Sequence, residues 1–176
     1  MTIKYKKGDL FEQIPRYTPI IIPHITNDIG AWGSGFVLPL ARMFPKARQE
    51  YLKNGVNLGL CQMIECGSIT IANMCAQTGI MGQSTGDRAH VNEKPIRYEA
   101  LTYCLRQLED YCKDSAYPIE VHAPAFGSDR SGGNWPIIHE LIEEILVSPS
   151  KIVVYYMDDQ QKNKMEKCLD FKMTSS

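Results

Sequence analysis

The segment from residue 19 to residue 35, Pro-Ile-Ile-Ile-Pro-His-Ile-Thr-Asn-Asp-Ile-Gly-Ala-Trp-Gly-Ser-Gly, decides the fold class. Its first part, Pro19 to Ile25, is a continuous run rich in β-branched residues, which is typical of a central strand buried on both faces. The second part carries Gly30, Gly33 and Gly35 and predicts a loop before a helix that begins near Phe36. A buried strand, a glycine-rich loop and a helix in this order indicate an α/β protein.

Strands and helices alternate on both sides of this segment. Further strands are predicted at residues 3–7, 60–66, 68–75, 119–123 and 152–156, and further helices at 45–55, 97–113 and 135–147. The clearest helix is 97–113, because Tyr98, Leu101, Leu105, Leu108 and Cys112 recur at spacings of three and four. This alternation predicts an α/β sandwich around a largely parallel sheet, formed by one domain over residues 1–157. Residues 158–176 are expected to be a polar tail with a short helix at most.

Composition excludes several classes of protein. The 176 residues carry 19 basic and 20 acidic side chains, so the near-zero net charge argues against general nucleic-acid binding. No apolar run approaches the ~20 residues that a membrane span needs. The six cysteines form no Cys-x-x-Cys pair, which favours reduced thiols, a cytoplasmic location and no metal site. They are Cys61, Cys66, Cys75, Cys104, Cys112 and Cys168.

A second glycine-rich loop, Gly127-Ser128-Asp129-Arg130-Ser131-Gly132-Gly133, also follows a predicted strand and precedes a helix. Since ligands bind beyond the carboxyl ends of parallel strands, the two loops are expected to meet at one edge of the sheet. Glycines permit positive φ and a close approach of backbone N–H groups to a ligand, and we expect Gly33 to need this freedom. Two such loops suit a diphosphate. The alternative is that the first loop is a plain turn and Asp129 with Arg130 a solvated surface pair.

Other candidate residues each have a structural alternative. His24, near the end of the central strand, is a possible acid or base, or else a core histidine. Asp9 follows the first strand and is either a ligand contact or a helix cap. Trp32 either stacks on a ligand or fills the pocket floor. Tyr155 and Tyr156 end the last strand, where one of them stacks on a base or both cap the core.

Taken together, five stretches resemble the macrodomain family, which binds ADP-ribose. They occur in the family's order and are Lys7–Phe11, His24–Gly35, Ala72–Gln77, Gly127–Arg130 and Ile152–Tyr156. The similarity is greatest to ADP-ribose 1″-phosphate phosphatase-like macrodomains, including small bacterial and phage forms. The resemblance implies a three-layer α/β/α sandwich with a mixed central sheet.

The resemblance also implies where the ligand binds. Asp9 would accept a hydrogen bond from the adenine amino group, the first loop would hold the distal ribose and a phosphate, and the second loop would hold the diphosphate. Either Tyr155 or Tyr156 would pack on adenine. The implied ligand-binding residues are Asp9, Leu10, Asn27, Asp28, Gly30, Ala31, Trp32, Gly33, Ser34, Gly35, Gly127, Ser128, Arg130, Ser131, Gly132, Tyr155 and Tyr156.

Two departures from related enzymes narrow the implied chemistry. One group uses a lysine after the central strand, but this chain has no lysine between Lys53 and Lys94. Another group carries paired asparagines where this chain has Asn27 followed by Asp28. The resemblance to the phosphatase-like macrodomains implies His24 and Asp129 as the catalytic pair, with Asp129 as base or nucleophile and His24 as acid, base or phosphate contact.

The expected function is hydrolysis of ADP-ribose 1″-phosphate, without metal or other cofactor. Two alternatives stay open. One is an enzyme that removes ADP-ribose from a protein or nucleic acid by another set of residues. The other is a non-catalytic reader of ADP-ribose or a related nucleotide. The expected partner in every case is ADP-ribose or a derivative, without a membrane.

Overall fold

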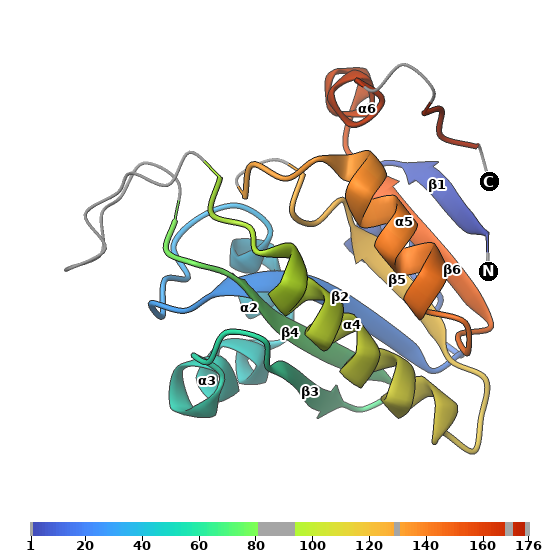
Figure 1. Cartoon of the computed structure of the whole chain (residues 1–176). Coiled ribbons are helices and arrows are strands. Elements are labelled where there is room, and N and C mark those ends of the chain that lie inside the picture. Colours follow the sequence, from blue (N-terminus) through green and yellow to red (C-terminus); the bar gives the residue numbers. More distant parts are fainter. Residues whose placement is uncertain (1, 81–93, 129–130, 168–170, 175–176) are drawn as a thin grey trace.

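The computed structural model describes residues 2–80, 94–128, 131–167 and 171–174. Its strands are β1 (Ile3–Lys7), β2 (Ile20–Asn27), β3 (Cys61–Cys66), β4 (Ile69–Gln77), β5 (Glu120–Pro124) and β6 (Lys151–Tyr156). They form one six-stranded sheet in the order β1-β6-β5-β2-β4-β3 (Figure 1). All neighbouring strands in this described sheet are parallel except β3, which runs antiparallel to β4. The predicted mixed sheet with a central β2 is therefore confirmed.

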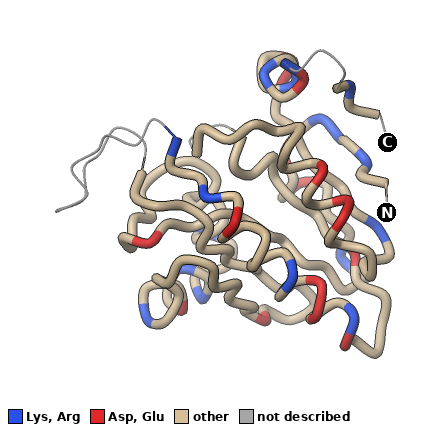
Figure 2. Tube along the Cα trace, viewed as in Figure 1, with Lys and Arg blue, Asp and Glu red and all other residues tan. Residues whose placement is uncertain are grey.

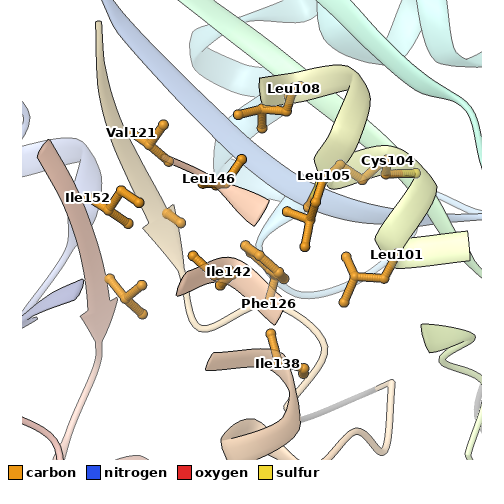
Figure 3. Packing of buried hydrophobic residues seen from close by; sticks show 14 of the residues in the cluster. Leu101, Cys104, Leu105, Leu108, Val121, Phe126, Ile138, Ile142, Leu146 and Ile152 are labelled. Carbon is orange, nitrogen blue, oxygen red and sulfur yellow. The ribbon is translucent and has the colours of Figure 1, made fainter. Parts of the chain in front are cut away.

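Helices cover both faces of the sheet and complete the three layers. The helices are α1 (Leu10–Gln13), α2 (Val37–Met43), α3 (Pro45–Asn54), α4 (Tyr98–Lys113), α5 (Trp135–Ile145) and α6 (Asp159–Met165). Side chains of α4 and α5 pack together against one face of the sheet, as Figure 3 shows for Leu105 and Ile142. On the other face, residues of α1, α2 and α3 form a second apolar cluster.

The central strand shows why a continuous apolar run is needed here. Ile21 belongs to the cluster under α4 and α5, whereas Ile20 and Ile22 belong to the cluster under α2 and α3. All three side chains are almost completely buried. Successive side chains of a strand point to opposite faces, so a strand covered on both sides must be apolar at every position.

The polar tail contributes to the core. The expected short helix is α6, whose Met165 is buried, and Met173 further along is buried as well. Residues 171–174 lie along β1, where the backbone N–H of Tyr5 donates to the carbonyl of Thr174 at 3.3 Å. The sequence-based predictions missed α1, a helix of four residues whose N-cap is Asp9.

Charged side chains of both signs are spread over the fold (Figure 2). The five cysteines among the described residues are free thiols. No helix in this part of the chain is both long and apolar enough to cross a bilayer.

Candidate functional site

The two glycine-rich loops leave the same edge of the sheet. The first follows β2 and the second follows β5, and these strands are parallel neighbours. The carboxyl ends of β1, β4 and β6 lie at this edge too, because they belong to the same parallel set. The sequence-based expectation that both loops share one edge is thus confirmed.

Gln77, the last residue of β4, joins the two loops. Its side-chain Oε1 accepts a hydrogen bond of 2.6 Å from the Ser131 hydroxyl in the second loop. Its carbonyl accepts one of 3.0 Å from the backbone N–H of Asp28 in the first. The Asp28 carboxylate in turn accepts from the N–H of Gly79 at 2.8 Å. Sequence reasoning did not name Gln77 as a site residue, because the predicted strand ended at residue 75. The available signal was its place in the stretch Ala72–Gln77.

Asn27 shapes the first loop from inside. Its Oδ1 accepts from the backbone N–H groups of Ile29 at 3.1 Å and Ala31 at 2.9 Å, while its Nδ2 donates to the Ala31 carbonyl at 2.8 Å. The Tyr51 hydroxyl donates to the Asn27 carbonyl at 2.6 Å, which ties the loop to α3. These bonds hold the loop in one shape. A contact between Asn27 and a ribose remains a prediction.

Only some of the loop glycines need to be glycine for conformational reasons. Gly30 and Gly35 have φ of +76° and +77°, in the left-handed region that favours glycine. Gly33 has no positive φ, and a Cβ there would meet nothing within 4 Å. The expectation that Gly33 needs left-handed backbone is therefore wrong, since the turns fall on its neighbours. In the second loop, Gly127 has φ of +77° and a Cβ would lie 2.8 Å from the Ile96 side chain.

Trp32 packs into the protein interior beneath the first loop. Its side chain is buried, and its indole N–H donates to the Val37 carbonyl at 3.1 Å. Its ring lies against Tyr51 and edge-on to His24, with ring centroids 5.3 and 5.4 Å away. Of the two interpretations of Trp32, the structure shows the one in which it packs into the protein. Ser34 is exposed on the same loop.

His24 packs against Trp32 and lies within β2 rather than at its end. Only 2% of the residue is exposed, and burial lowers the pKa of its imidazole to about 4. Its Nε2 is 2.5 Å from Oδ1 of Asn73 on β4. Its Nδ1 has no hydrogen-bond partner among the described residues. The ring is thus neutral at physiological pH, and its role in catalysis remains a prediction.

The second loop uses its serine hydroxyls internally. Ser128 donates to the Ala125 carbonyl at 2.8 Å, as Ser131 does to Gln77. Both serines are buried, and Gly132 has φ of +67°. The described residues of this loop therefore offer a ligand mainly backbone groups. Asp129 and Arg130, predicted as catalytic and binding residues, lie outside the described residues.

Asp9 has the helix-capping role, and its contact with a ligand remains a prediction. One carboxylate oxygen accepts from the backbone N–H of Phe11 at 2.9 Å and so caps α1. That bond leaves the other oxygen able to accept from a ligand. Leu10 is buried in the core.

The structure also distinguishes the two tyrosines. Tyr155 is buried, its hydroxyl pairs with Nδ1 of His122 at 2.8 Å, and burial raises the pKa of the phenol to about 12. Tyr156 is half-buried at the strand end, so it is the tyrosine with surface left for a ligand. Within the described ranges, no group of three or more metal-binding side chains comes together.

Comparison with known proteins gives relatives of one kind. The chain is 42% identical over 52 residues to an ADP-ribose 1″-phosphate phosphatase of Lodderomyces elongisporus. This match covers 29% of this chain and 32% of that protein. It is 28% identical over 123 residues to one of Debaryomyces hansenii, which covers 69% of this chain and 62% of that protein. The chain thus spans less than two thirds of the length of these curated relatives. No family model matches.

A solved structure supports the same grouping over the whole fold. A macrodomain protein from Streptomyces coelicolor superposes with a TM-score of 0.69 and 28% identity, covering 89% of this chain and 99% of that one. Together with the mixed six-stranded sheet and the two loops at its edge, this shows that the chain belongs to the macrodomain family.

Proposed function

We propose that this macrodomain binds ADP-ribose derivatives and hydrolyses ADP-ribose 1″-phosphate to ADP-ribose and phosphate. The observation that carries the proposal is the junction at Gln77, which brings the loops after β2 and β5 together at the carboxyl edge of the sheet. Both curated relatives are named for this reaction.

The arrangement along the edge supports an extended ligand. At one side, Asp9 follows β1 and Tyr156 ends β6, and these two strands are paired. A carboxylate oxygen that accepts from an amino group beside an aromatic ring suits adenine. In the middle, the glycine backbone of the second loop suits a diphosphate. On the other side, the first loop and His24 suit the distal ribose and its phosphate.

The proposed chemistry takes one water and breaks the bond between phosphorus and the 1″ oxygen. Asp129 serves as base or nucleophile, and His24 assists proton transfer. Backbone N–H groups of the loops stabilise charge on the phosphoryl oxygens.

Steady-state phosphate release from ADP-ribose 1″-phosphate tests this directly. We expect Asp129→Ala and His24→Ala each to lower turnover by at least ~100-fold, the scale of a general acid or base. Asp28→Asn tests the competing carboxylate, because it removes the charge of Asp28 while an amide oxygen can still accept from Gly79. If only the Asp28 variant loses activity, the catalytic assignment is wrong while fold and ligand stand.

A non-catalytic reader is the second candidate, and one observation favours it. His24 is only 2% exposed beneath Trp32, which limits its access to a substrate. Calorimetry with ADP-ribose separates the two functions. Micromolar binding by wild type without phosphate release, and without release of ADP-ribose from modified protein or nucleic acid, would establish the reader and refute the phosphatase.

A further inference from the structure

A buried chain of amides connects His24 to α3. Asn73 of β4 stands in the middle, with its Oδ1 at His24 and its Nδ2 donating to the carbonyl of Ala47 at 3.0 Å and to Oε1 of Gln62 at 3.1 Å. Gln62 continues the chain, since its Nε2 donates to the carbonyl of Glu50 at 2.7 Å. Asn73 is 1% exposed, so its bonds to His24 and to the Ala47 carbonyl are out of water, whereas the two bonds of Gln62 are partly buried.

Backbone carbonyls fix the orientation of both amides. A carbonyl oxygen can only accept, so the atom of Gln62 that faces the Glu50 carbonyl must be its nitrogen. The other atom of that amide, Oε1, is then an acceptor for Asn73. The Ala47 carbonyl independently requires a nitrogen from Asn73. Two separate backbone groups therefore agree that Asn73 turns its nitrogen to α3 and its oxygen to His24.

This orientation determines which nitrogen of His24 carries the proton. Oδ1 of Asn73 can only accept, so Nε2 of His24 must donate and must hold a hydrogen. A neutral imidazole has one N–H, so Nδ1 carries a free lone pair. That lone pair is buried and unpartnered within the described residues. A buried acceptor without a partner is costly, which makes this nitrogen a candidate for a functional role.

We propose that Asn73 is a positioning residue that holds His24 in the neutral Nε2–H tautomer, so that Nδ1 is the proton acceptor of the hydrolysis. This inference rests on the proposed function and narrows it. His24 takes the role of base, so it is not the initial acid, and Asp129 is then neither the group that accepts the proton of the water nor the nucleophile. As the water oxygen bonds to phosphorus, one of its protons passes to Nδ1. As the bond between phosphorus and the 1″ oxygen breaks, Nδ1 passes this proton to the 1″ oxygen, and ADP-ribose and phosphate leave.

The tautomer can be measured on the wild-type chain by nitrogen-15 NMR of the imidazole rings at pH 7. The chain has four histidines, and the signals lost in His24→Gln identify those of His24. We expect a protonated Nε2 and an unprotonated Nδ1. A proton on Nδ1, or a doubly protonated ring at this pH, would overturn the proposal whatever the enzyme's activity.

Two variants test the part played by Asn73. Asn73→Ala removes the acceptor, and we expect the His24 signals to show a loss of the pure Nε2–H form. Gln62→Ala is the matched control: it removes a neighbouring bond but leaves the Ala47 carbonyl and His24 bonded to Asn73, so the tautomer should be kept. Unchanged His24 signals in Asn73→Ala would refute the positioning role. If Asn73→Ala does not fold, Asn73→Leu takes its place, because leucine has a similar size and no acceptor, and we expect the same loss of the pure Nε2–H form.

Activity separates this inference from the proposed function. If the tautomer is as expected and His24→Gln retains full turnover of ADP-ribose 1″-phosphate, the base role is refuted while the phosphatase stands. If the wild type has no turnover, the proposed function fails and the base role with it, although the tautomer holds. A loss of at least ~100-fold in His24→Gln with an active wild type supports both.

Discussion

Lowering the pH from 7 to 5 should destabilise this protein through His24. Burial lowers the pKa of the folded imidazole to about 4, against 6.5 for the free side chain. Between these values the unfolded chain binds a proton that the folded protein excludes. The contribution of His24 to the free energy of unfolding is therefore fully present above pH 6.5 and is lost as the pH falls toward 4. Integrated from pH 7 to pH 5, the loss from this one group is about 2 kcal/mol.

Urea unfolding at the two pH values measures the effect, with His24→Gln as the comparison. The buried ring of His122 and the half-buried ring of His139 also have pKa values lowered by burial. Both proteins contain these rings, so their contributions cancel in the difference. We expect the variant to lose about 2 kcal/mol less than wild type on acidification. An equal loss in the two proteins would show that His24 is not held neutral by burial.

Three further predictions concern residues at the carboxyl edge of the sheet. Asp9→Ala should weaken ADP-ribose binding more than tenfold by calorimetry, because a hydrogen bond to a charged group contributes about 1.5–3 kcal/mol. Asp9→Asn is the control, since it keeps an acceptor for the helix cap, and native affinity in the alanine variant would exclude the adenine contact. Gly127→Ala should lower the melting temperature, since its Cβ meets Ile96, whereas Gly33→Ala should not; equal melting temperatures would contradict the strain argument. Tyr156→Ala should weaken ADP-ribose binding more than Tyr155→Phe, and the opposite order in the same titration would place the adenine on Tyr155.

The regular elements were predictable because their signals are local. Apolar spacing places α4 to within a residue, and β2 is visible as a run that only a strand buried on both faces requires. The shared edge of the two loops followed from the parallel connection of strand, loop and helix. The helix α1 was missed because a four-residue helix has no period to detect, and its one signal was the cap at Asp9.

The location of the candidate site could be predicted from the sequence, but the contacts among its side chains could not. The glycine loops mark the edge, but the sequence does not show that Trp32 turns inward or that Tyr155 is held by His122. These outcomes depend on which face of a strand each side chain takes and on partners far along the chain. The bond between Asn73 and His24 joins residues on neighbouring strands, and only the pairing of β2 with β4 brings them together.

The segment along β1 has a consequence for how the protein behaves in concentrated solution. An edge strand offers unpaired backbone groups to any other strand that approaches, and this invites aggregation. Here the N–H of Tyr5 and the carbonyl of Ile3 are already taken by Thr174. Residues 171–174 therefore cover β1, the outermost strand on that side of the sheet. Truncation after α6 would remove this cover together with the buried Met173, so we expect the shortened protein to be less stable and more prone to self-association.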